Sequence, residues 1–161
     1  MKLAKLCTAV WLGLCASSVR AEPTQSTLTI AAGTVTIHYT AAELLSRTDL
    51  ASIQIPPQVD YDVSLTVQAV PLLDLLTAFP LEGFDRLEAS ATDGFVAQIP
   101  LSLIEAGSSG GSVAWIAVEN LGHPWPKLPG KDTGAGPFYL IWQYPNGPGW
   151  RVSSGRICWK D

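Results

Sequence analysis

Residues 120–142 constrain the fold of this chain more than any other stretch. Four prolines and four glycines interrupt regular structure between residues 122 and 137, and the apolar run at 138–142 then has the composition of a buried strand. Irregular segments of this length inside a compact domain are usually functional or disordered, and the Trp, His and Lys side chains here argue against disorder. We therefore expect a long loop that leads into a core strand, and we expect binding chemistry on that loop.

The first 21 residues have the pattern of an export signal peptide. A short basic start precedes an apolar stretch that is too short to anchor stably in a bilayer, and residues 19–21 give the small-x-small pattern that a signal peptidase recognises. We predict cleavage after Ala21 and a soluble, periplasmic mature protein with no stable membrane insertion. An uncleaved anchor is one alternative. Lipidation at Cys15 is another, although Leu14 stands where that processing needs a small residue.

Cleavage leaves 140 of the 161 residues, and we predict that residues 22–161 form a single domain. Three of the ten basic residues lie in the signal and none of the fourteen acidic residues does. The mature chain therefore has seven basic and fourteen acidic residues, and a net charge of −7. Because phosphate binding needs a basic surface, this balance argues against nucleic acid as a partner.

The basic residues are concentrated near the C-terminus. Residues 22–119 hold Arg47 and Arg86 against twelve acidic residues, whereas residues 120–161 hold five basic residues against two acidic ones. This C-terminal quarter can be a binding site for an anion or a surface that contacts a partner. Alternatively, it is a basic edge of the domain that is only solvated.

Cys158 is the one cysteine left after cleavage, so no intramolecular disulfide can form. Burial in the last strand is favoured over an intermolecular pair or a reactive thiol.

The chain after the signal has the pattern of many short strands with two or three short helices. Thr40 and Glu43 form a capping-box pattern ahead of a helix over residues 41–47, and Pro71 can begin a second helix, which ends near Phe79. Strands are expected at residues 28–30, 35–39, 51–55, 63–67, 86–91, 95–99, 113–118, 138–142, 150–153 and 156–159, a further short helix at 100–106, and a flexible linker at 107–112. This interleaving predicts an α+β domain with a mixed, largely antiparallel sheet.

Motifs for common catalytic chemistry are absent from the sequence. It has no nucleophile elbow, dinucleotide fingerprint or phosphate loop, and His38 and His123 are too few and too distant for a zinc site. Aromatic rings beside cations in the C-terminal quarter can stack on a planar anion or form a partner hot spot. The candidate ligand-binding residues are Asp93, His123, Trp125, Lys127, Lys131 and Arg151. Several of these residues also have simpler structural roles. Asp93 can serve only the hairpin turn with Gly94, and the lysines can be solvated surface residues. Trp125 is less expected to pack in the core than other tryptophans of the chain.

Three ordered segments resemble the oxidoreductase molybdopterin-binding domain, the sulfite oxidase fold. They are Val-Pro-Leu-Leu-Asp-Leu-Leu at residues 70–76, Ala-Thr-Asp-Gly-Phe-Val-Ala-Gln-Ile-Pro-Leu at 91–101, and Gly-Pro-Phe-Tyr-Leu-Ile-Trp at 136–142. The similarity covers residues 63–142. It implies the sulfite oxidase fold and, in the family, a molybdenum pterin held by a cysteine thiolate and by His and Arg contacts to the pterin phosphate.

This chain departs from the family at the residues that hold the cofactor. No cysteine lies between Ala16 and Ile157, and Tyr139 stands where an arginine often follows the Gly-Pro step. Neither Ser nor Thr replaces a thiolate well, because the soft ligand sets the electronics of the metal. The signal also lacks the Arg-Arg pair of the route by which folded cofactor proteins are exported.

We therefore expect a secreted domain without a cofactor that acts as a binding or accessory module for a small anion or a periplasmic redox protein. One alternative is a molybdopterin-dependent oxidoreductase with a reduced cofactor site, in which Asp93 and the long loop line the pterin. Another is an electron-transfer accessory for a haem protein.

Overall fold

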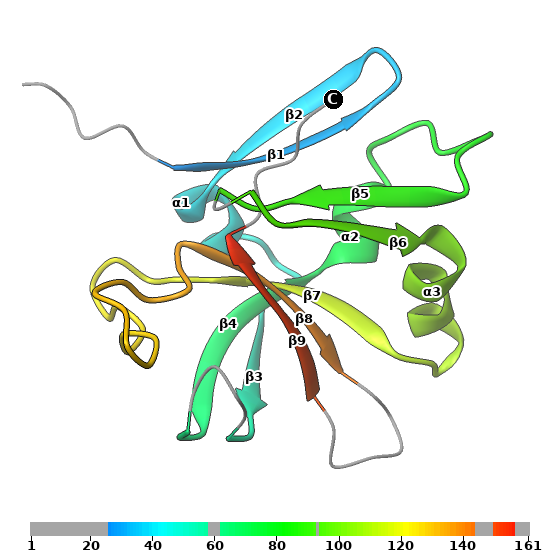
Figure 1. Ribbon diagram of the computed structural model, residues 1–161. Helices are drawn as coiled ribbons and strands as arrows, with labels where there is room; N and C mark the ends of the chain where they lie inside the picture. The colour runs from blue at the N-terminus through cyan, green and yellow to red at the C-terminus, as the bar shows by residue number, and fades with distance from the viewer. Residues whose placement is uncertain (1–25, 58–61, 93, 144–149, 157–161) are drawn as a thin grey trace, which may run out of the picture.

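The computed structural model describes residues 26–57, 62–92, 94–143 and 150–156 (Figure 1). The strands are β1 (Thr27–Ala32), β2 (Val35–Thr40), β3 (Ala51–Ile55), β4 (Leu65–Pro71), β5 (Arg86–Ser90), β6 (Val96–Pro100), β7 (Val113–Val118), β8 (Phe138–Gln143) and β9 (Trp150–Arg156), and the helices are α1 (Ala41–Leu45), α2 (Leu72–Leu76), α3 (Leu101–Glu105) and the 3-10 helix η1 (Ala106–Ser109). All strand pairings in these ranges are antiparallel. The predicted α+β class with a largely antiparallel sheet and short helices is confirmed.

A five-stranded sheet forms the centre of the domain, with the strand order β3-β4-β7-β8-β9. Its middle strands β7 and β8 are continuous apolar runs rather than alternating ones, because both faces of the sheet are covered there. Along β7, Ala114 and Ile116 face one side and Ala117 the other. No helix within the described ranges is long and apolar enough to span a bilayer. The predicted signal peptide and Cys158 lie outside those ranges.

The two faces of this sheet carry separate hydrophobic clusters. The larger cluster joins Ile116 and Leu140 of the sheet to Leu72 and Leu75 of α2, and all four side chains are fully buried. Figure 1 shows the β1–β2 and β5–β6 hairpins stacked over this side of the sheet. The smaller cluster, on the opposite face, contains Ile53, Ile55, Val67, Ala69, Ala117, Ala135, Tyr139 and Ile141. The segment between β7 and β8 contributes to the smaller cluster, so this loop is part of the fold.

The N-terminal hairpin follows the predicted alternation. Val35, Ile37 and Tyr39 in β2 are partly buried, whereas Thr36 and His38 between them are exposed. The His38 ring therefore points to solvent, as expected for a half-exposed strand residue.

The predicted capping box forms at the start of α1. The Thr40 hydroxyl accepts a hydrogen bond from the Glu43 N–H at 3.2 Å, and the Glu43 carboxylate accepts one from the Thr40 N–H at 2.7 Å. The helix ends at Leu45, two residues earlier than predicted. Just beyond the C-cap Ser46, Arg47 forms a two-pronged ion pair with Asp49, at 2.6 and 2.8 Å.

The predicted hairpin between β5 and β6 is also confirmed. The Ala91 N–H donates to the Phe95 carbonyl at 2.7 Å, and the Gly94 N–H donates to the Ala91 carbonyl at 3.0 Å. Gly94 has a φ of +89°, a conformation that glycine adopts without strain. Asp93, the predicted turn residue and candidate ligand, lies outside the described residues.

The junction of β4 and α2 differs from the sequence prediction. Pro71 does not begin the helix, because its φ of −59° and ψ of 128° are extended and it pairs with Trp115 of β7. It is the last strand residue and the N-cap of α2, which begins at Leu72. The strand also begins later than expected, at Leu65. The missing N–H of a proline is tolerated at this junction as well as in the first turn of a helix.

Two further segments differ from the expectation. Residues 107–112 are not a flexible linker, because they include most of η1, which is closed by a 2.8 Å hydrogen bond from the Gly111 N–H to the Ala106 carbonyl. β9 is one strand over residues 150–156, where a strand ending at residue 153 was expected. Its pairing with β8 has a register irregularity between Tyr139 and Ile141, which lets the strand continue past Ser153 and Ser154.

Candidate functional site

The loop over residues 119–137 connects two neighbouring antiparallel strands, β7 and β8. Its two ends meet, since the Glu119 N–H donates a 2.8 Å hydrogen bond to the Pro137 carbonyl. Figure 1 shows it, in yellow to orange, extending beyond one side of the sheet, with α3 on the other side. Its long irregular path therefore begins and ends at a single point of the core.

The carboxylate of Glu119 holds the loop to its own base. Glu119 Oε1 accepts a 2.7 Å hydrogen bond from the Trp125 N–H, six residues along the chain. Gly136, at the other end of the loop, lies against the same carboxylate, so closely that a Cβ at this position would overlap its oxygens. Glycine is needed here for close approach. Glu119 was not singled out from the sequence, because a single acidic residue after a strand has no distinctive pattern.

A side-chain turn shapes the first part of the loop. Asn120 Oδ1 accepts a 2.8 Å hydrogen bond from the Gly122 N–H, and the His123 N–H donates to the Asn120 carbonyl at 2.8 Å. Asn commonly makes such turns with its own backbone neighbours. The turn leaves His123 and Leu121 exposed to solvent.

Trp125 packs against the hydrophobic core, a role that the sequence favoured less for this residue than for other tryptophans. Its side chain is partly buried and packs on the smaller cluster, with its ring edge-on to Tyr139 at a centroid distance of 6.3 Å and an interplanar angle of 61°. Tyr139 is only 2% exposed. Edge-to-face aromatic pairs of this kind add to the free energy gained by burying the rings. Trp125 therefore fixes the loop to the sheet.

The two lysines lie in the outer part of the loop. A turn closes there through hydrogen bonds from the Leu128 N–H to the Thr133 carbonyl at 3.0 Å and from the Lys131 N–H to the Leu128 carbonyl at 2.9 Å. Lys127 and Lys131 are both exposed. Lys127 Nζ lies 3.9 Å from Asp132 Oδ1, and both side chains are largely in water, so this pair is weak.

The structure brings together some of the predicted site residues and separates others. His123, Trp125, Lys127 and Lys131 share one loop. Arg151 lies in β9 opposite Trp142, four residues beyond the point where the loop enters β8, and its side chain is outside what the structure describes. The β5–β6 hairpin is in a different layer, over the larger cluster (Figure 1), and Asp93 lies outside the described residues.

Tyr139 stands where an arginine often follows the Gly-Pro step in the family that the sequence resembles. Here the position is a buried tyrosine covered by the Trp125 ring, so it offers neither a positive charge nor an open surface. Among the residues that the structure describes, no three His, Cys, Asp or Glu side chains are grouped so that they could hold a metal ion.

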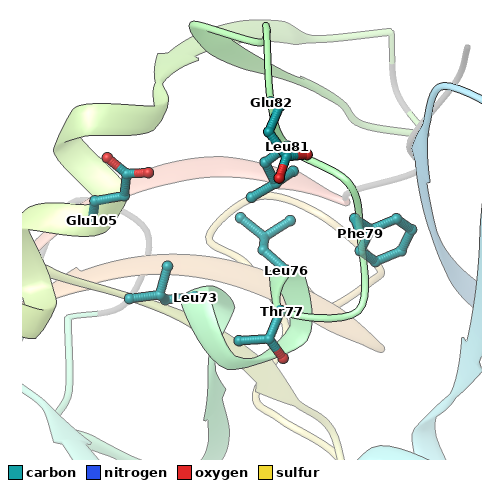
Figure 2. Close-up of a pocket in the computed structure, with 7 residues that line it drawn as sticks. All are labelled: Leu73, Leu76, Thr77, Phe79, Leu81, Glu82 and Glu105. Carbon is teal, nitrogen blue, oxygen red and sulfur yellow. The ribbon is translucent and has the colours of Figure 1, made fainter.

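A pocket lies away from the loop, beside α2 and α3 (Figure 2). The sequence analysis predicted the apolar face of α2 but no cavity on it, because a cavity depends on which elements fail to cover that face.

Comparison with known proteins finds no matching family model, no matching curated protein and no matching solved structure.

Proposed function

We propose that this protein is an exported binding or accessory module without a cofactor, built on a domain related to the sulfite oxidase fold. Its 119–137 loop holds a small anion or an acidic face of a periplasmic redox partner. The observation that carries the proposal is that the loop is anchored to the sheet while His123, Lys127 and Lys131 remain exposed on it.

Anchoring favours binding because a loop that is already ordered loses less conformational entropy when a ligand binds. The Glu119 and Trp125 contacts hold the loop before any ligand arrives. A partner therefore meets cations on a preformed backbone, and less of the interaction free energy is spent on ordering. Exposed cations also attract an anionic partner over several ångströms and raise its association rate.

The loop lysines are less neutralised than Arg47 and Arg86. Arg47 pairs with Asp49 at 2.6 Å and Arg86 pairs with Asp85 at 2.9 Å, whereas Lys127 has only the 3.9 Å contact to an exposed aspartate. In a protein with excess negative charge, these lysines form the part of the described surface best suited to an anion.

The first experiment is an anion titration of the mature protein followed by backbone amide chemical shifts, with sulfite, sulfate and phosphate as probes. We expect saturable shifts within residues 119–137. Lys131→Glu should weaken binding about threefold to tenfold, as expected for reversing one rim charge. Arg86→Glu changes the net charge equally at a distant site and should leave the affinity within about twofold. Equal losses in both variants, or no saturable shifts in the loop, would exclude this site.

The enzyme alternative is tested separately by metal and pterin content. The mature protein is exported through its own signal in a cofactor-producing bacterium and purified without chelators. Stoichiometric molybdenum with pterin fluorescence would make the protein an oxidoreductase and would overturn the proposal. A preparation without either supports the accessory role.

A further inference from the structure

The pocket beside α2 has a volume of about 390 Å³, within the range of small-molecule sites. Its walls come from α2, from the segment that follows α2, and from α3 (Figure 2). It lies on the side of the domain away from the 119–137 loop (Figure 1), so it is a separate site from the one proposed above.

The interior of the pocket is apolar. Leu76 and Phe79 belong to the larger core cluster and are 1% and 7% exposed. Leu73 and Leu81 are only partly buried and also line the opening. Figure 2 shows Leu76 in the middle of the group, between Leu73 and Leu81. An apolar ligand body placed here would cover the exposed parts of Leu73 and Leu81 and rest on the buried Leu76, and covering apolar surface favours binding.

Two carboxylates stand at the rim of the pocket. Glu105 comes from α3 and Glu82 from the segment after α2, so they reach the pocket from different parts of the chain (Figure 2). Both residues are exposed, and of the described residues that line the pocket none is basic. Neither carboxylate has an ion-pair partner in the described part of the chain.

We propose that this pocket binds a small organic monoamine with an apolar body. The apolar part lies against Leu73 and Leu81, over the buried Leu76, and the ammonium group lies toward Glu82 and Glu105. An anion would be repelled by the two carboxylates, and a neutral molecule of the same shape would gain only the apolar contacts. The combination of an apolar interior with a rim of a single charge sign therefore selects an amphipathic cation.

The test compares three probes that share one aromatic ring, followed by backbone amide shifts of the mature protein. They are the 2-phenylethylammonium ion, the neutral 2-phenylethanol and the phenylacetate anion. We expect the cation to give saturable millimolar shifts in α2, in residues 77–82 and in α3. The alcohol should bind about five- to tenfold more weakly, as the loss of two exposed ion pairs implies, and phenylacetate should give no saturable shifts. Raised salt should weaken cation binding only.

Matched variants locate the charge effect. Glu82→Gln with Glu105→Gln should weaken cation binding about five- to tenfold and leave alcohol binding unchanged. The control pair, Asp62→Asn with Glu88→Gln, removes the same net charge at exposed positions outside the pocket and should have little effect. All four side chains are exposed, so the variants are expected to fold. Equal affinity for cation and alcohol, unchanged cation binding in the first pair, or shifts that map elsewhere would each overturn the proposal.

Discussion

The carboxylate of Glu119 accepts a 2.7 Å hydrogen bond from the backbone N–H of Trp125 and so ties the middle of the long loop to its first residue. The Trp125 ring then packs edge-on to buried Tyr139. These contacts hold an irregular segment with four prolines in one arrangement on the sheet, and the first three predictions concern them.

Glu119→Ala should loosen the loop. The variant removes a charged acceptor from a backbone N–H, which costs about 1–3 kcal/mol of unfolding free energy in similar cases. Amide hydrogen exchange at Trp125 should accelerate. The amides of β7 should exchange at nearly the wild-type rates, once any change in the free energy of global unfolding is taken into account. Glu119→Gln keeps an oxygen acceptor and should retain more protection. Unchanged exchange at Trp125 in the alanine variant would contradict the anchoring role.

Gly136→Ala should act through the same contact. The added Cβ would overlap the Glu119 carboxylate, which must then swing away and release the Trp125 N–H. We expect a loss of about 1–3 kcal/mol, measured by urea unfolding. In a Glu119→Ala background the same substitution should cost much less, because the obstructing group is gone. Additive losses in the double variant would show that the two residues do not interact.

Trp125→Ala should destabilise the domain rather than only weaken binding. A fully buried tryptophan costs about 3–5 kcal/mol on truncation, so about 2 kcal/mol is expected for this partly buried ring. His123→Ala, two residues earlier and exposed, should change stability by less than about 0.5 kcal/mol. Urea unfolding of both variants makes the comparison. If Trp125→Ala unfolded at the same urea concentration as the wild type, the ring would cover the surface without stabilising the domain.

Stability should fall in acid through the Arg47–Asp49 pair. The hydrogen bonds from the Arg47 guanidinium hold the pKa of Asp49 below its ordinary value of 3.8. Because the pKa is lower in the folded state, the ionised carboxylate stabilises the fold above pH 3.8, and this contribution disappears as the pH falls through the folded-state pKa.

Asp49→Asn tests this by removing the charge. At pH 7 the variant should be roughly 0.5–1 kcal/mol less stable than the wild type, since the pair is partly exposed. The difference should shrink toward zero well below pH 3.8, where the wild-type carboxylate is also neutral. Urea midpoints at both pH values provide the measurement. A constant difference across this range would assign the effect to packing instead of charge.

Local patterns in the chain were sufficient for most of the fold. The Thr40–Glu43 capping box, the hairpin with Gly94 in its turn, and the apolar runs of β7 and β8 were all predicted from neighbouring residues. Such signals work because their physics is short-range: a cap needs a hydroxyl three residues from an N–H, and a tight turn needs a residue that accepts positive φ. Pro71 shows the limit, since its backbone preference suits both a strand end and a helix start.

Relations between distant residues were decided by the tertiary structure. The sequence located the loop and its lysines, but only packing of the sheet put Trp125 on Tyr139 and Gly136 against Glu119. It also separated Arg151 from the loop along β8, and it brought Glu82 and Glu105 to the lining of one pocket. The physical reason is that short-range hydrogen bonds and backbone preferences are written in consecutive residues. Burial and close approach instead depend on which surfaces meet when the whole chain folds.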